Sequence, residues 1–294
     1  NIRVIVPVLY SYTAMIPSLP PSTGPIGVFD SGYGGLTILD KIRGLMPEYD
    51  YIYLGDSARC PYGPRSFEVV YEFTLQAVSK LFELGCPLVI LAATQHRQKA
   101  LRTIQQINLP VIDATRRVLG VIRPTAECIG EITRSRHVGI LATAGTIKSE
   151  SYLLEIHKLS PDIVVTGEAC PMWVSLVENN EYQSEGADYF VKQHINRLLD
   201  KDPMIDTINW DDPLSVTVDK IRQFTPGHIR IIAQGEYVAR SLQDYLNRHP
   251  EMDARCEKGG KCRFLTTESE NKFEESASIF LGRQDIKVES IALE

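Results

Sequence analysis

Residues 26–47 read IGVFDSGYGGLTILDKIRGLMP and set the pattern for most of the chain. The apolar run IGVFD is typical of a buried strand, and the glycines after it are typical of a tight turn. Residues 36–47 then have the apolar spacing of an amphipathic helix. Because strands that alternate with helices form parallel sheets covered by their crossover helices, the sequence predicts an α/β fold.

The same alternation continues along the chain. Further strands are expected at residues 51–56, 86–93, 109–113, 137–143 and 162–169, and a strand followed by a helix at residues 229–246. Helices are expected at residues 67–85, where Gly85 is a stop signal, and at residues 99–106 and 146–159. Because the rhythm restarts near residue 137, we expect two pseudo-symmetric domains, each a mainly parallel sheet flanked by helices, with the site in the cleft between them.

The expected domain boundaries follow from this restart. The first α/β domain takes residues 25–121 plus 233–294, and the second takes residues 122–232. Residues 1–24 are apolar but interrupted by four prolines, carry one basic residue and include no initiator methionine. We therefore expect them to be an extension that is disordered or artificially added, rather than a signal peptide or a membrane span.

Composition and charge narrow the class of protein. The chain has 294 residues, 44% of them hydrophobic and 23% charged, which is ordinary for a folded globular protein. Its net charge of −6 argues against nucleic acid and favours a small-molecule partner. Six widely spaced cysteines point to a reducing cytoplasm, and only Cys256 and Cys262 lie close enough in sequence to suggest a disulfide or half a metal site. We expect no metal.

Two loops carry candidate binding residues. In GVFDSGYGG, Asp30 and Ser31 end a strand before a glycine turn, which could offer backbone N–H groups to an anion; the alternative is that they only cap the helix. In GDSARCPYG, the residues Pro61, Tyr62 and Gly63 form a second turn, for which ordinary loop packing is the alternative. Neither loop is decisive alone.

Taken in order, four motifs resemble those of glutamate racemases. They are FDSGYGG at residues 29–35, GDSARCPYG at residues 55–63, ATAGTIKSESY at residues 142–152 and CPMWVSLVE at residues 170–178. The resemblance begins near Pro25 and extends to the segment FLTTESENKFEESASIFLG. It implies a two-domain enzyme, usually a homodimer, that interconverts L- and D-glutamate for peptidoglycan synthesis without a cofactor.

The family's two catalytic cysteines are the feature that this chain lacks. The resemblance places one cysteine thiolate on each face of the α-carbon, where each thiol can act as acid or base. Aligned on the unbroken frame around each motif, Ala93 stands at the first cysteine position and Asp212 at the second. Their neighbours differ too, since Thr94, Gln95 and Pro213 stand where the family carries polar substrate contacts.

The remaining candidate residues can support a site but cannot replace the thiols. Asp30 and Glu178 match auxiliary carboxylates of the family, while Thr143 and Thr146 match hydroxyls at the cleft, with capping or packing as the alternative. Asp212 is a weak base at an ordinary carboxyl pKa of about 3.9. His96 and Cys60 are the nearest nucleophile-like side chains in sequence, and we expect neither to take over, since a general base must be within hydrogen-bond reach.

Three functional hypotheses are compatible with these residues and motifs. The first is a glutamate racemase in ancestry and pocket whose racemisation is abolished or severely impaired. The second is a non-catalytic protein that binds a small dicarboxylate or amino acid, or regulates through it, on the same fold. The third, a lyase or decarboxylase using one thiol, is disfavoured because neither family thiol position holds a cysteine. A fold alone cannot choose among them, because function depends on the site.

Overall fold

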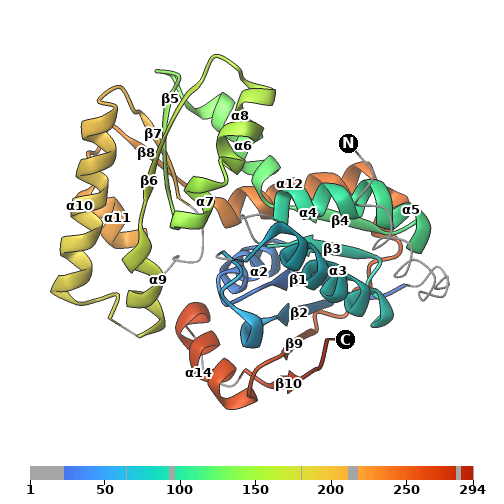
Figure 1. The fold of residues 1–294 in the computed structure, drawn as a ribbon. Helices are drawn as coiled ribbons and strands as arrows, with labels where there is room; N and C mark the ends of the chain where they lie inside the picture. The colour runs from blue at the N-terminus through green and yellow to red at the C-terminus, as the bar shows by residue number, and fades with distance from the viewer. Residues whose placement is uncertain are drawn as a thin grey trace.

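The computed structural model describes residues 23–63, 65–92, 97–179, 181–210, 218–282 and 286–293. It contains two sheets whose described strand pairs are all parallel, each covered by helices on both faces (Figure 1). The predicted α/β class with two helix-flanked parallel sheets is therefore confirmed. The exact domain boundaries at residues 121/122 and 232/233 stay a prediction.

The first sheet has the strand order β10-β9-β2-β1-β3-β4. Its strands are β1 (Ile26–Asp30), β2 (Tyr51–Gly55), β3 (Leu88–Leu91), β4 (Arg117–Gly120), β9 (Cys262–Thr266) and β10 (Val288–Ser290). One face packs against α2 (Gly35–Leu45), α12 (Gln234–Arg248) and α14 (Glu270–Leu281). The other face packs against α3 (Phe67–Glu83), with α4 (Arg97–Thr103), a π-helical turn η2 (Ile104–Asn108) and α5 (Leu109–Ile112).

The second sheet has the order β6-β5-β7-β8. Its strands are β5 (His137–Ala142), β6 (Val164–Ala169), β7 (Thr207–Trp210) and β8 (Arg230–Ala233). The helices α6 (Ile122–Ile132), α7 (Ala144–Lys148) and α8 (Ser151–Leu159) cover one face. The helices α9 (Pro171–Glu178), α10 (Glu185–Lys201) and α11 (Val218–Phe224) cover the other.

The two sheets repeat one strand order. The order β6-β5-β7-β8 matches β2-β1-β3-β4 strand for strand, and the first sheet adds β9 and β10 beside β2. In this comparison β1 corresponds to β5, and β3 corresponds to β7. The loops that follow corresponding strands therefore occupy equivalent places in the two sheets. The restart of the sequence pattern near residue 137 therefore reflects a repeated arrangement of strands.

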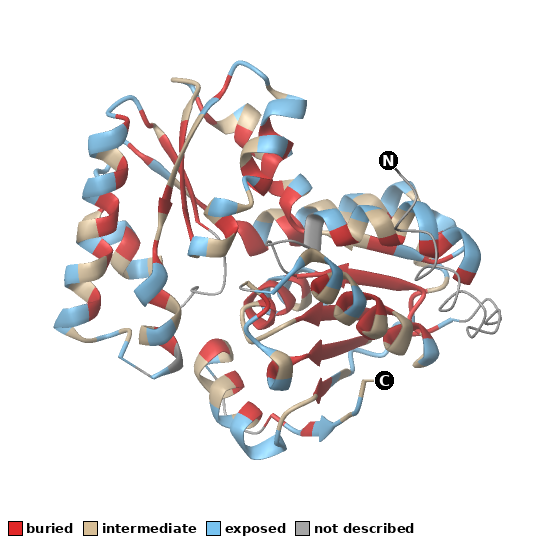
Figure 2. Cartoon of the chain, viewed as in Figure 1, coloured by how far each residue is buried: buried red, intermediate tan, exposed pale blue. Residues whose placement is uncertain are grey.

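The core joins the two sheets through α12. Strands β1, β2 and β3 are buried along their whole length, as expected for parallel strands covered on both faces (Figure 2). Helix α12 packs against α2 of the first sheet and also against α6 of the second. Figure 1 shows α2, α7 and α9, which follow β1, β5 and β6, at the junction of the two units. The carboxyl ends of β1, β5 and β6, where the candidate site was predicted, therefore face this junction.

Two expected elements were wrong. Residues 109–113 do not form a strand: Leu109–Ile112 is a short helix with Pro110 in its first turn, a position where proline lacks only an N–H that would be unsatisfied anyway. The strand beside β3 is Arg117–Gly120 instead. The expected helix over residues 146–159 is two helices, because Glu150 has a left-handed backbone with φ 52° between them.

Of the expected N-terminal extension, residues 1–24, the structure describes only the last two residues. Residues 1–22 lie outside the described residues, whereas Gly24 bridges to Cys256 and accepts a hydrogen bond from the backbone N–H of Glu257 at 2.9 Å. No helix in the described ranges is both long and apolar enough to cross a membrane.

Candidate functional site

The turn after β1 is organised by the carboxylate of Asp30, which is 6% exposed. One of its oxygens accepts the backbone N–H of Ser31 at 2.8 Å, and the other accepts the N–H of Gly35 at 2.9 Å. Asp30 therefore takes two of the N–H groups that the sequence offered to an anion. These two bonds are capping contacts at the start of α2, and a ligand contact of Asp30 stays a prediction.

Close approach explains why Gly35 is a glycine. A Cβ at this position would lie 2.8 Å from the Cβ of Asp30 and 2.9 Å from the Cβ of Ala92. Real Cβ contacts do not come this close, so any side chain would displace a neighbour. Ala92 is the last described residue before the segment that begins at Ala93. The end of β3 thus abuts the turn that carries Asp30.

The loop after β2 is anchored by Asp56, which is fully buried. Its carboxylate accepts hydrogen bonds from Arg59 Nε at 2.7 Å, from Thr267 Oγ1 at 2.8 Å and from the hydroxyl of Tyr62. The hydroxyl of Tyr62 thus points at Asp56, and its ring packs against Phe73 with centroids 5.5 Å apart. These contacts hold the Tyr62 side chain in the loop, and a ligand contact of Tyr62 stays a prediction.

The two loops lie against each other. The backbone N–H of Asp56 donates to the carbonyl of Asp30 at 2.9 Å. A Cβ on Gly32 would lie 3.6 Å from the sulfur of Cys60, which precedes Pro61 through a cis peptide bond. The structure therefore brings together the predicted residues Asp30 and Ser31 with Pro61, Tyr62 and Gly63.

In the second sheet, Thr143 and Thr146 form one cap. Thr143 is the residue before α7, and its hydroxyl accepts the backbone N–H of Thr146 at 3.3 Å. The two hydroxyls lie 3.1 Å apart, and Thr146 is 2% exposed. The capping alternative therefore describes what Thr143 does in the structure. By the repeated strand order Thr143 follows β5 where Ser31 follows β1, so the pair occupies matching places.

Several predicted residues lie outside the description. Residues 93–96 and 211–217 are not described, which leaves out Ala93, Thr94, Gln95, His96, Asp212 and Pro213. Glu178 ends α9, and its side chain is likewise outside the described set. Chain position still relates the two key residues: Ala93 comes two residues after the end of β3, and Asp212 two residues after the end of β7. These strands match in the repeated order.

The six cysteines are all described and carry thiols rather than disulfides, which removes the suggested Cys256–Cys262 disulfide. Burial raises the pKa of Cys86, Cys128 and Cys256 to about 12, and burial also raises the pKa of Cys170. Cys128 is only half-buried, whereas Cys86, Cys170 and Cys256 are buried. Such thiols are poor sources of thiolate at neutral pH.

Within the described ranges, no group of three or more His, Cys, Asp or Glu side chains is arranged to hold a metal ion.

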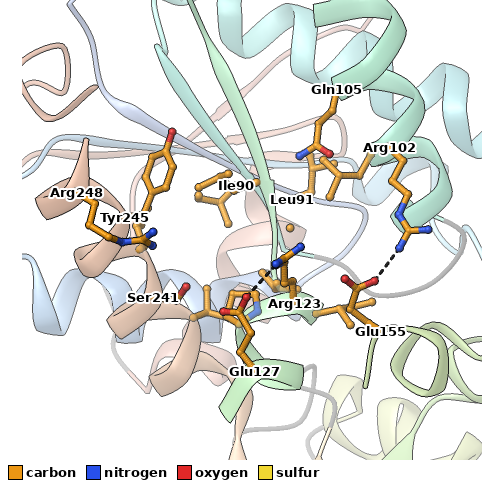
Figure 3. A pocket seen from close by; sticks show the side chains of 18 residues that line it. Ile90, Leu91, Arg102, Gln105, Arg123, Glu127, Glu155, Ser241, Tyr245 and Arg248 are labelled. Carbon is orange, nitrogen blue, oxygen red and sulfur yellow. Dashed lines mark hydrogen bonds and ion pairs between the residues drawn. The ribbon is translucent and has the colours of Figure 1, made fainter. Parts of the chain in front are cut away.

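A cavity of about 320 Å³ lies at the seam of the two units (Figure 3). Its walls come from β3, α4, η2, β4, α6 and α12, with Glu155 from α8. Arg102 on α4 binds Glu155 across the cavity at 2.7 Å, and Arg123 binds Glu127 at 2.9 Å. None of the candidate-site residues that the structure describes lines it, so neither Asp30 nor Thr143 belongs to its walls.

The sequence analysis did not identify three residues that hold the loops after β1 and β2, namely Tyr33, Thr267 and Glu268. Thr267 binds Asp56, and Tyr33 donates to Glu268 at 2.9 Å. Thr267 and Glu268 follow β9, more than 200 residues away in sequence from their partners. Only the position of Tyr33 between two glycines offered a signal, because a large aromatic side chain there needs a partner surface.

Comparison with known proteins identifies the family. No family model matches the chain. Curated relatives include the glutamate racemases of Shouchella clausii, 31% identical over 92% of this chain and 95% of the relative, and of Bacillus cereus, 34% identical over 92% and 97%. A solved glutamate racemase of Bacillus anthracis superposes with a TM-score of 0.81 at 30% identity, covering 92% of this chain and 98% of that one. One from Francisella tularensis, solved with D-glutamate, gives 0.77 at 27%, with the same coverage. The chain belongs to the glutamate racemase family.

Proposed function

We propose that this chain is a glutamate racemase scaffold that binds a glutamate-like dicarboxylate where the two units meet, and that its racemisation is abolished or severely impaired. The observation that carries this proposal is the matched position of Ala93 and Asp212, each two residues beyond the end of a strand that corresponds to the other in the repeated order. Cysteines are expected at both places, and neither is present.

The reaction explains why these two positions matter. Inverting an α-carbon requires removal of a proton from one face and delivery of a proton to the other, so two acid–base groups must oppose each other. Alanine has no ionisable group. An aspartate with an ordinary pKa of about 3.9 is a weak base for an α-proton unless its surroundings raise that pKa. We therefore propose that Asp212 does not restore the missing chemistry.

The other cysteines do not offer a replacement. Cys86 and Cys170 are buried in the hydrophobic cores, and burial raises the pKa of both thiols. Cys60 lies beside the turn at Gly32, yet it belongs to the loop after β2 rather than to either matched position. A base is useful only where it reaches the proton it removes.

The binding part of the proposal rests on the retained loops. The turn of Asp30 and Ser31, the loop of Pro61, Tyr62 and Gly63, and the cap of Thr143 and Thr146 keep their family motifs, and the Francisella tularensis relative was solved with D-glutamate. We propose that these loops, together with Thr94, Gln95 and Pro213, contact the ligand, and that Asp30 and Glu178 act as auxiliary carboxylates. No cofactor is required for this role.

The cellular setting is also a proposal. Relatives named glutamate racemases support a link to the D-glutamate of peptidoglycan. We propose a cytoplasmic homodimer that contacts neither nucleic acid nor membrane. Sedimentation velocity at micromolar concentration tests the dimer, because a single species at the mass of one 33.0 kDa chain would contradict it.

Two measurements test the function together. Purified protein is first checked by mass spectrometry for Ala93 and Asp212, and then incubated with each glutamate enantiomer in D₂O while the α-proton signal is followed by NMR. We expect no exchange above the buffer rate and a measurable heat of D-glutamate binding by calorimetry. Exchange that is lost in Asp212→Ala would show that the carboxylate has taken over.

The same pair of measurements separates the alternatives. Binding without exchange leaves an impaired racemase and a non-catalytic dicarboxylate-binding protein, and these differ in their response to repair of the two motifs. Absence of both binding and exchange would contradict the proposal that the retained loops form a glutamate site.

A further inference from the structure

The loop that follows β9 contacts both candidate-site loops of the first sheet. Strand β9 pairs with β2 in parallel register, with Thr266 opposite Gly55, so residues after the two strands emerge side by side. The backbone N–H of Thr267 donates to the carbonyl of Gly55 at 3.1 Å. The segment Thr267–Glu268, which we call the brace, therefore begins where the loop of Asp56 begins.

Thr267 fixes the loop after β2 from two sides. Its hydroxyl donates to Asp56 Oδ1 at 2.8 Å and accepts the backbone N–H of Ala58 at 3.1 Å. Asp56 is fully buried, and its other oxygen is shared by Arg59 and Tyr62. Because a buried carboxylate is costly unless its oxygens are hydrogen-bonded, the hydroxyl of Thr267 completes this anchor.

Glu268 fixes the turn after β1 through Tyr33. The hydroxyl of Tyr33 donates to Glu268 Oε2 at 2.9 Å, and Lys272 on α14 binds the other oxygen. The ring of Tyr33 lies 5.2 Å from the ring of Phe273, which is also on α14 and fully buried. The turn is thus attached to the brace by a hydrogen bond and to α14 by aromatic packing.

The peptide around Tyr33 is held from its other side as well. The hydroxyl of Tyr53 on β2 donates to the carbonyl of Gly32 at 3.0 Å. Gly32 and Gly34 flank Tyr33, so the backbone here is intrinsically free and its ordering depends on these contacts. Loss of the Tyr33 hydrogen bond would leave the turn with the Tyr53 contact, the Asp30 cap and backbone bonds such as that from the N–H of Asp56 to the carbonyl of Asp30.

We infer that Thr267 and Glu268 are positioning residues that hold the Asp30–Gly35 turn and the Asp56–Gly63 loop in fixed relation, so that both present their ligand-facing groups together. The ligand in this inference rests on the proposed function, whereas the contacts of the brace are independent of it. Neither residue belongs to the motifs that carry the predicted ligand contacts. The brace acts through Asp56 and Tyr33.

The test uses the full chain and two readouts. Amide hydrogen exchange followed by mass spectrometry reports the order of peptides covering residues 29–36 and 55–63, whether or not a ligand binds. Calorimetric titration with D-glutamate reports affinity. The variants are Glu268→Ala, Glu268→Gln, Tyr33→Phe, Thr267→Val and Thr267→Ser. The control is Glu289→Gln, which removes an exposed partner of Arg263 on the same sheet, at 2.8 Å, without touching either loop.

The expected pattern is specific to each arm of the brace. Glu268→Ala and Tyr33→Phe should each speed exchange in residues 29–36, and their combination should add little, because both remove the same Tyr33–Glu268 hydrogen bond. Thr267→Val should speed exchange in residues 55–63, and Thr267→Ser should restore it by returning the hydroxyl. Each damaging change should weaken D-glutamate binding about three- to tenfold, the effect of one hydrogen bond.

A purely structural role predicts something else. If Thr267→Val and Glu268→Ala lower the thermal midpoint but leave exchange in both loops at the level of Glu289→Gln, the inference is wrong. If the unmodified protein gives no heat with D-glutamate, the binding proposal fails. In that case the amide-exchange rates of residues 29–36 and 55–63 still test whether Thr267 and Glu268 position the two loops. Equal rates in all variants would contradict this inference.

Discussion

Replacing Asp56 by asparagine should test how firmly the loop after β2 is anchored. The carboxylate is fully buried and accepts three side-chain donors, and Arg59, its charged partner, is 22% exposed. The amide that replaces this carboxylate would keep one acceptor for Thr267 but would turn a donor toward Arg59 and the hydroxyl of Tyr62. One charge-assisted hydrogen bond is then lost and a guanidinium N–H is left facing a donor.

The expected cost follows from these contacts. A hydrogen bond to a charged group contributes about 1.5 to 3 kcal/mol, and removing one partner of a buried ion pair costs about 3 to 5 kcal/mol. Because Arg59 is partly exposed, water can take over part of its solvation, and we expect Asp56→Asn to lower the free energy of unfolding by about 2 to 3 kcal/mol.

A matched substitution on the surface provides the control. Asp162 accepts two hydrogen bonds from Arg136, at 2.6 and 2.7 Å, but the pair is exposed. Exposed ion pairs contribute little because water and salt screen them, so Asp162→Asn should leave stability near that of the parent. Urea unfolding of both variants, followed by circular dichroism, gives the comparison. Equal midpoints for the two variants would refute the view of Asp56 as a buried anchor.

Three further predictions concern the turn, the acid stability and the missing motifs. Gly35→Ala should destabilise by about 1 to 3 kcal/mol, since its Cβ would lie 2.8 Å from Asp30, whereas Gly44→Ala in the same helix meets nothing within 4 Å and should stabilise by up to about 1 kcal/mol in urea unfolding. Burial opposes ionisation of Asp206, but hydrogen bonds from the backbone of Ser135 and the hydroxyl of Thr133 hold its pKa well below the usual value. Its contribution is therefore present above about pH 4, the unfolded pKa, and lost as pH falls through the folded pKa, so Asp206→Asn should flatten the stability profile below about pH 4 in acid titration of urea midpoints. Ala93→Cys with Asp212→Cys should give little racemisation by chiral chromatography, whereas restoring both full motifs should give a measurable rate, because groups that act as a unit are not additive; an inert but folded full-motif variant would favour the binding protein.

The sequence predicted the sheet architecture because buried parallel strands carry a strong local signal. IGVFD and HVGILA are short, largely apolar runs bounded by proline or polar residues, and both form strands. The signal failed at LPVID, where Leu109, Val111 and Ile112 look like a strand but Pro110 suits the first turn of a helix equally well. Short apolar runs cannot be assigned by periodicity alone.

The candidate site was predictable in its loops and not in their bonding. The sequence placed Asp30, Ser31 and Tyr62 near the carboxyl ends of strands, and the structure brings these loops together. The sequence could not show that both carboxylate oxygens of Asp30 accept hydrogen bonds from its own turn, or that the hydroxyl of Tyr62 donates to Asp56. Those bonds depend on side-chain direction and, for Thr267, on a strand that joins the sheet from the far end of the chain.

Under the proposed function, Ala93 and Asp212 stand where the family carries its two catalytic cysteines. The strands before both positions, β3 and β7, are buried, regular and matched in the repeated order. Asp30, Asp56 and Thr143 keep ordered polar contacts at the neighbouring strand ends. These contacts anchor the loops after β1 and β2 and the start of α7, whether or not a ligand binds. Under the proposed function these anchored loops hold a ligand without an acid–base pair, and restoring both cysteine motifs is the change that separates a disabled racemase from a binding protein.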